Sequence, residues 1–339
     1  MNADRSRAGV AATRRPVLAC EGAPRDLGLD QGLALREELR RFAAARGVEL
    51  PFADEVTSGR LGLPILERVV SALGAWARSR AAGDDPASAL LERDLARHFP
   101  QLAERCEGLA RGARVPERFV LEACEAEERS AAGAACLVLV ADGAGPLVAR
   151  ALPPSRPPSL RLRRTHPENG LRSLELVSSL GLGAIAGVNE AGLAACWSIA
   201  AEPRGAGAHG PRGSRGCAAP AILLVQECLQ RFESVEGAAG WCTDRPARGP
   251  REAAGAIEIL LADASGAVAG VRRAGEGAAR FAPSPVSRAD AAAALGALGS
   301  QGAIVLDPRA RRAALLSDPT RIRVGLEELD SEPVVAAEP

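Results

Sequence analysis

Lysine is absent from this chain, and all 42 of its basic residues are arginine. A Walker-type phosphate loop ends in Gly-Lys, and protein kinases and Schiff-base enzymes also need a lysine. The sequence therefore excludes nucleotide-triphosphate chemistry of these kinds and pyridoxal phosphate as a cofactor. Nothing else in it indicates a bound cofactor.

Aromatic and histidine residues are scarce. Tyrosine is absent, aromatic residues make up 3% of the chain, and the formal net charge is zero. Nucleic-acid binding needs positive charge and stacking surface, so we expect no nucleic-acid partner. The eight cysteines form no Cys-x-x-Cys pair and only three histidines accompany them, so we expect no metal site and interpret most cysteines as small buried hydrophobes.

Long apolar runs are also missing. No stretch approaches the roughly 20 apolar residues that a membrane helix needs, and no hydrophobic region follows the arginines of residues 1–15. The sequence therefore predicts a cytoplasmic protein without a membrane partner.

The first third of the chain has the spacing of amphipathic helices. Between residues 27 and 129 apolar side chains recur every three and four residues, as in Leu35, Leu39 and Phe42, and prolines divide the stretch. We expect a flexible N-terminus over 1–17 and a helical leader over 18–135.

From Cys136 onward the pattern changes to short strands. Residues 136–150 are typical of a strand, a Gly-rich turn and a second strand. Further strands are predicted at 171–177, 182–188, 192–199, 257–262, 267–271 and 279–281, and helices at 218–231 and 234–242. This order predicts an α+β fold with two sheets between helical layers over 136–330, followed by a flexible tail over 331–339.

Five segments carry a family resemblance. They are Glu21–Gly32 with its Gly-x-Pro-x-x-x-Gly-x-x-x-Gly pattern, Gly133–Val138, Gly187–Leu193 with its Gly-x-Asn-x-x-Gly-Leu pattern, Ala221–Arg231 followed by Ser234–Ala238, and Leu260–Gly266. In this order they resemble the acyl-coenzyme A:isopenicillin N acyltransferase (penicillin acyltransferase) family of cysteine N-terminal-nucleophile hydrolases. The resemblance implies a four-layered αββα sandwich with a helical N-terminal segment.

The resemblance also implies a chemistry. Cys136 would be the nucleophile and would first cut its own bond to Ala135, and its freed α-amine would act as the base. Asn189 would stand in the oxyanion hole, and the substrate would be a linear amide or an acyl thioester, with coenzyme A thioesters among the donors. The sequence leaves open whether two chains pair as a homodimer.

Each of these residues also has a plainer interpretation. Cys136 can be a packed core thiol, and Asn189 can be a turn residue that tolerates left-handed φ. Arg150 can bind a substrate carboxylate through both guanidinium arms, or it can be a solvated charge at a strand end.

Three positions depart from the family pattern. Ala135 replaces a glycine before the nucleophile, and Pro153 replaces the acidic residue of the family's Arg-Asn-x-Asp motif. Asp142 or another carboxylate would then have to take the place of that acidic residue. Asp142 can also be only the turn residue of the hairpin. Glu258 falls where the family has an asparagine as second oxyanion donor. An ionised glutamate repels an oxyanion, whereas a neutral one can still donate.

These departures leave two hypotheses. The chain is either an autoprocessed cysteine amide hydrolase or acyltransferase, or an inactive relative that keeps the fold as a small-molecule-binding or scaffold protein.

Overall fold

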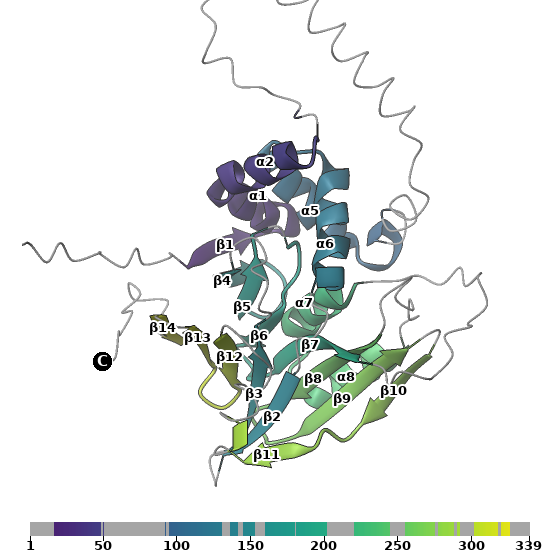
Figure 1. The fold of residues 1–339 in the computed structure, drawn as a ribbon, viewed down its shortest axis with the longest axis vertical. Coiled ribbons are helices and arrows are strands. Elements are labelled where there is room, and N and C mark those ends of the chain that lie inside the picture. Colours follow the sequence, from purple (N-terminus) through teal and green to yellow (C-terminus); the bar gives the residue numbers. More distant parts are fainter. Residues whose placement is uncertain are drawn as a thin grey trace, which may run out of the picture.

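The strands of the chain form two sheets (Figure 1). The computed structural model describes residues 17–48, 50, 92, 95–130, 136–141, 145–152, 160–179, 181–201, 220–244, 255–274, 277–287, 290–291, 302–317 and 320–325. The eight-stranded sheet has the order β1 (Leu18–Gly22), β4 (Leu160–Pro167), β5 (Ser173–Ser178), β6 (Ala186–Asn189), β7 (Ala194–Ala201), β8 (Gly255–Ala262), β9 (Val268–Ala274) and β10 (Gly277–Phe281). The six-stranded sheet has the order β11 (Pro285–Ser287), β2 (Cys136–Ala141), β3 (Gly145–Ala151), β12 (Gly302–Asp307), β13 (Arg312–Ser317) and β14 (Thr320–Gly325).

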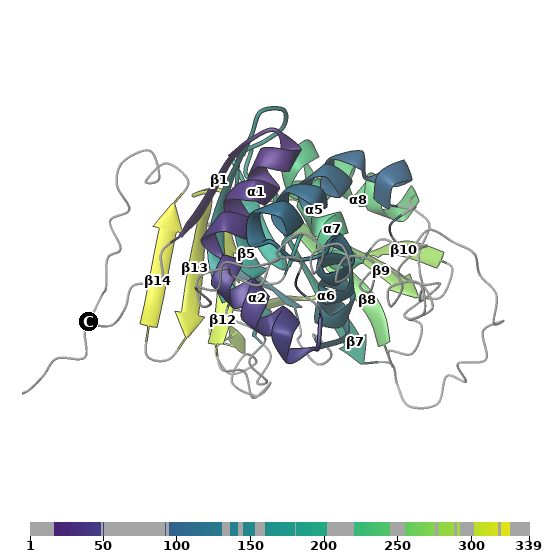
Figure 2. The ribbon, with the colours of Figure 1, turned by 90° about the horizontal axis from the view of Figure 1, so that it is seen from above.

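Helices cover one face of the eight-stranded sheet (Figure 2). They are α1 (Pro24–Ala34), α2 (Arg36–Ala45), α5 (Pro100–Ala113), α6 (Glu117–Ser130), α7 (Ala221–Arg231) and α8 (Val235–Asp244). Every residue of α7 from Ala221 to Gln230 is buried, because this helix lies between the sheet and the neighbouring helix α6. Its buried residues include the polar Gln226, Glu227 and Gln230, so this helix brings hydrogen-bonding groups as well as apolar side chains into the interior.

The other face of the eight-stranded sheet packs against the six-stranded sheet. Successive side chains in a strand point to opposite faces. Val148 of β3 and Leu306 of β12 belong to the main hydrophobic core, whereas Ala149 and Val305 belong to a second cluster with Ala291. At β3 and β12 both faces of the six-stranded sheet are therefore covered.

Residues 290 and 291 are helical and lie at the outer face of the six-stranded sheet. Ser287 Oγ accepts a hydrogen bond from the backbone N–H of Asp290 at 3.1 Å, as the side chain of a helix N-cap residue does. Ala291 follows and packs on Ala149. The expected α+β sandwich of two sheets with helices on the outside is confirmed for the residues described.

The glycines of the opening Gly22–Gly32 pattern bring two helices into backbone contact. A Cβ on Gly28 of α1 would lie 2.0 Å from the carbonyl oxygen of Arg105, and a Cβ on Gly108 of α5 would lie 2.0 Å from that of Arg25. Gly32 and Gly112 repeat the contact one turn further on. The pattern thus has a packing function, since any larger side chain would force the helices apart.

The N-terminal segment differs from the expected purely helical leader. Residues 18–22 form β1, which pairs in parallel with β4 from Leu18 opposite Arg163 to Gly22 opposite Pro167. Leu39 and Leu109 share one hydrophobic core with Leu174 and Leu261. The segment before Cys136 is therefore built into the same sheet and core as the segment after it. The part of the predicted helical stretch over 51–91 lies outside the described residues.

Candidate functional site

Cys136 is the first residue of β2, the second strand of the six-stranded sheet. The predicted hairpin is confirmed: β2 and β3 are antiparallel, with Cys136 directly opposite Arg150. Residues directly opposite each other in such a pair share one face of the sheet. For residue 136 the structure describes the backbone only, and Ala135, Asp142 and Pro153 lie outside the described residues.

Arg150 joins the two sheets. Its side chain is buried, and its Nε donates to the backbone carbonyl of Trp197 in β7 at 2.6 Å. Its guanidinium also lies 5.2 Å from the centre of the Trp197 ring, within cation–π range. The interpretation of Arg150 as a solvated charge at a strand end is therefore wrong.

Glu258 stands on β8 and is held in an ion pair. In register it lies between Ser198 of β7 and Arg272 of β9, and its Oε1 accepts from Arg272 Nε at 2.8 Å. The helix-covered face of these strands is identified by Arg280, because its side chain binds Glu236 of α8. Arg280 lies opposite Val271, the residue before Arg272, so Val271 is on the helix-covered face. Strand alternation then places Glu258 on the other face, toward the six-stranded sheet.

Asn189 has all its hydrogen-bonding groups engaged. Its Nδ2 donates to the carbonyls of Leu229 and Phe232 at 3.0 and 2.8 Å, and its Oδ1 accepts from Leu193 N at 2.9 Å. Its backbone N–H donates to Leu193 O at 3.0 Å. The side chain thus closes the turn that leads to Gly192, which has a φ of +88°, and binds the carboxyl end of α7. Asn189 is therefore a turn residue, but the left-handed φ expected of it belongs to Gly192. The hydrogen bonds of Asn189 leave none of its donors for an oxyanion.

Three of the four sequence-predicted residues lie on strands that contact one another. Cys136 and Arg150 face each other across β2 and β3, these strands contact β7 and β8, and Glu258 lies on β8. Asn189 lies apart, since its side chain points to α7 on the helix-covered face. The contact between the two sheets therefore includes the strands that carry Cys136, the buried Arg150 and the ion-paired Glu258.

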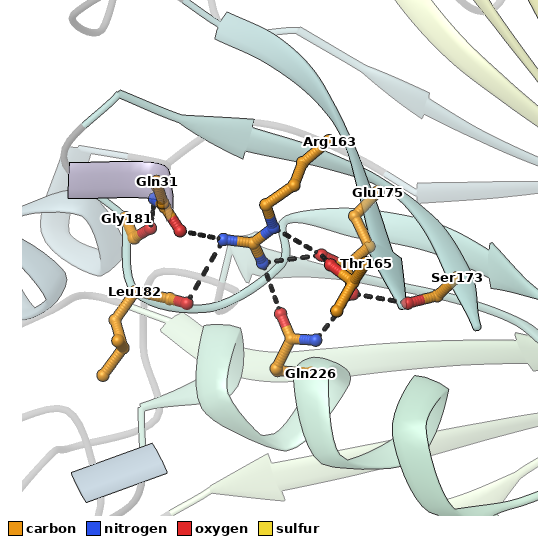
Figure 3. A network of polar contacts seen from close by, with 8 residues as sticks. All are labelled: Gln31, Arg163, Thr165, Ser173, Glu175, Gly181, Leu182 and Gln226. Carbon is orange, nitrogen blue, oxygen red and sulfur yellow. Dashed lines mark hydrogen bonds and ion pairs between the residues drawn. The ribbon is translucent and has the colours of Figure 1, made fainter. Parts of the chain in front are cut away.

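Sequence reasoning missed a buried polar network under the helices (Figure 3). Arg163 of β4 and Glu175 of β5 are both fully buried, with Arg163 Nη2 and Glu175 Oε2 2.6 Å apart. Glu175 also accepts from Thr165 at 2.9 Å, Ser173 at 2.7 Å and Gln226 at 2.6 Å. Gln226 of α7 in turn accepts from Arg163 Nη2 at 2.6 Å.

Gln31 ties the network to α1. Its Oε1 accepts from Arg163 Nη1 at 2.5 Å, and its Nε2 donates to the carbonyl of Gly181 at 2.8 Å. Burial alone would raise the pKa of Glu175, but Arg163, Arg105 and the hydrogen bonds from Ser173 and Gln226 outweigh it and lower that pKa. The signal in the sequence is Glu175 itself, a charged residue inside the apolar strand Ser-Leu-Glu-Leu-Val.

The cysteines that the structure describes with their side chains behave as the sequence predicts. Cys20, Cys106, Cys124, Cys196, Cys228 and Cys242 are all buried and free of disulfides. Among the described residues no three His, Cys, Asp or Glu side chains gather in a way that could hold a metal ion. In the same ranges no helix combines the length and apolar character needed to cross a bilayer.

Comparisons with known proteins give similarity at the level of solved structures. No family model matches this chain, and no curated protein is significantly similar to it. Penicillin V acylase from Agrobacterium tumefaciens has a TM-score of 0.37 and 14% sequence identity, over 57% of this chain and 87% of that one. Two variants of a conjugated bile acid hydrolase from Clostridium perfringens have TM-scores of 0.35 and 0.40 at 10% and 9% identity, over 61% and 60% of this chain and 96% and 97% of theirs. The chain is thus similar to an acylase and a hydrolase, at scores that carry no argument about its own activity.

Proposed function

We propose that this chain is an autoprocessed cysteine amide hydrolase or acyltransferase of the N-terminal-nucleophile type, related to the penicillin acyltransferases. Its substrate would be a linear amide or an acyl thioester. The observation that supports this most directly is the place of Cys136, which opens β2 opposite the buried Arg150 where the two sheets meet.

In the proposed first reaction the chain cuts itself. The Cys136 thiolate attacks the carbonyl carbon of Ala135, the C–N bond breaks, and the nitrogen of Cys136 takes up a proton. A thioester joins Ala135 to the sulfur until water hydrolyses it, which leaves an Ala135 carboxylate and a free thiol. Cys136 then carries an α-amine whose unperturbed pKa of about 7.7–8.0 suits a general base near neutral pH.

In the proposed second reaction the same thiol attacks the carbonyl of a substrate. The acyl group moves to the sulfur, the amine or thiol leaves with a proton, and water or an amine then accepts the acyl group. Arg150, on the same face as residue 136, would bind a substrate carboxylate. Because its Nε is already bound to Trp197, this recognition would use its two terminal nitrogens.

Intact mass of the purified protein tests the proposal. Cleavage between Ala135 and Cys136 gives two fragments whose masses sum to that of the precursor plus one water. Cys136→Ala should abolish it and leave a single chain. Cys217→Ala is the matched control and should still be cleaved. In this variant the thiol of Cys136 should form an acyl adduct with a small thioester.

A specific observation favours the second hypothesis, an inactive relative that keeps the fold as a small-molecule-binding or scaffold protein. Asn189 has its donors engaged, and Glu258 accepts from Arg272 where an oxyanion donor is needed. Losing one oxyanion donor typically costs about 10²–10³ in rate. A wild-type chain that stays uncleaved and forms no acyl adduct on Cys136 would rule out the enzyme, and a thermal shift with a linear N-acyl amide would then support binding without turnover.

A further inference from the structure

Arg105 of α5 is a buried cation without a hydrogen-bond partner. It is 1% exposed, and its Nε, Nη1 and Nη2 are all buried and unpartnered in the part of the chain that the structure describes. Burial, and to a lesser degree Arg163, lowers its pKa to about 10, so it stays charged at neutral pH. An unpaired buried charge costs several kcal/mol, which natural folds seldom leave uncompensated.

The charged groups around Arg105 do not neutralise it. Arg163 repels it and Glu175 attracts it. Both oxygens of Glu175 are already occupied, because the carboxylate binds Arg163 and accepts from Thr165, Ser173 and Gln226. Among the described residues two arginines thus share one saturated carboxylate, which leaves one positive charge over.

The surroundings of Arg105 also limit the size of any partner. All three guanidinium nitrogens are buried, so a partner must fit inside the folded chain. The neighbouring thiol of Cys20 in β1 is itself buried, and its pKa is raised mainly by that burial. A ligand here must therefore be small enough to be enclosed with the guanidinium.

We infer that the Arg105 guanidinium binds a small monovalent inorganic anion of the chloride class, enclosed beneath α1 and α5 beside the Arg163–Glu175 pair. One uncompensated charge calls for a monovalent ion, and the burial of the guanidinium favours a small one. Such an ion accepts hydrogen bonds from the guanidinium N–H groups and neutralises the positive charge of Arg105. This site is independent of the proposed chemistry at Cys136.

Thermal unfolding in matched salts tests the site. The wild-type protein should gain about 5 °C in melting temperature when chloride rises 100-fold at constant ionic strength, with gluconate as the replaced anion, because a ligand of the native state stabilises it by mass action. Arg105→Met should lose this response and should melt no lower than wild type in gluconate, since it removes the uncompensated charge. Arg111→Met, an exposed arginine of the same helix, should respond like wild type.

A direct readout keeps the inference falsifiable if Arg105→Met does not fold. Crystals of the wild-type protein soaked in sodium bromide should show an anomalous peak within hydrogen-bond distance of the Arg105 guanidinium. Equal melting temperatures of the wild type in chloride and gluconate, a chloride response that persists in Arg105→Met, or a bromide-soaked crystal without that peak would each overturn it.

Discussion

Arg150 and Trp197 connect the two sheets through one short bond, in which Arg150 Nε of β3 donates to the Trp197 carbonyl of β7 at 2.6 Å. Most contacts between the sheets are apolar and therefore non-directional. A charge-assisted hydrogen bond adds a defined orientation to them. It also fixes the position of β3 and, through the Cys136–Arg150 pairing, of the strand start at Cys136.

Removing this bond should cost stability even without any substrate. Arg150→Met would leave the Trp197 carbonyl buried and unpaired, at a cost of about 1.5–3 kcal/mol. Urea denaturation should show this loss. The control is Arg25→Met, because Arg25 forms an exposed ion pair with Glu107 and should cost less than about 1 kcal/mol. Equal losses in both variants would mean that Arg150 does not hold the sheets together.

The Arg163–Glu175 pair should make stability dependent on pH. The folded pKa of Glu175 is lowered relative to an ordinary value of about 4.3. Its stabilising contribution is therefore fully present above the unfolded pKa and is lost as the pH falls through the folded pKa. Glu175→Gln should lose about 3–5 kcal/mol at pH 7, because it leaves Arg163 unpaired.

The pH dependence of the free energy of unfolding tests whether Glu175 is ionised in the folded protein. The stability difference between wild type and Glu175→Gln should shrink as the pH is lowered from about 5 to 3, measured by urea denaturation at each pH. Glu233→Gln, which changes an exposed carboxylate, should follow the wild-type curve. A difference that stays constant with pH would contradict the assignment of Glu175 as an ionised partner.

The glycine contact between α1 and α5 should be intolerant of a methyl group. Gly28→Ala and Gly108→Ala each place a Cβ 2.0 Å from a backbone oxygen, and overpacking of this kind typically costs about 1–3 kcal/mol. Gly237→Ala in α8 is the matched control, since its Cβ would meet side-chain atoms alone, the Phe232 ring at 3.2 Å and Ser234 Oγ at 3.6 Å, and alanine favours helices by up to about 1 kcal/mol. Calorimetric melting of the three variants checks this, and a wild-type melting temperature for Gly28→Ala would refute the contact.

Asn189→Ala separates a structural role from a catalytic one. The substitution leaves the carbonyls of Leu229 and Phe232 and the N–H of Leu193 without their partner, at about 1–3 kcal/mol for each group that water cannot reach. The free energy of unfolding should therefore drop, whereas Asn169→Ala in an exposed turn should stay within about 0.5 kcal/mol of wild type. A fully stable Asn189→Ala that no longer cleaves itself would instead support the oxyanion role.

The sequence predicts the individual helices and strands of this fold better than it predicts which strands pair with each other. The hairpin at Cys136, the helices α7 and α8 and the strands β5 to β10 follow from apolar periodicity and lie within a few residues of their predicted bounds. β4 is missed because four of its eight residues are charged or histidine. Its Arg163 is buried only because Glu175, on the next strand, neutralises it.

Strand pairing over long distances could not be read from local patterns. β1 has five residues and finds its partner β4 some 140 residues later, and no strand is predicted beyond Phe281 although β12 pairs with β3. The candidate site shows the same limit. The positions of Cys136, Arg150 and Glu258 follow from the predicted strands. The hydrogen-bond partners of Asn189 at the end of α7 and of Glu258 on β9 could not be predicted from local patterns.

The parallel pairing of β1 with β4 has a consequence for any break in the chain before Cys136. The N-terminal piece would keep an edge strand in the large sheet and the core residues of α2, α5 and α6 in the common interior, so the pieces would stay together as one particle. Gel filtration in native buffer would show the size of the uncut chain, and only a denaturant would separate the halves.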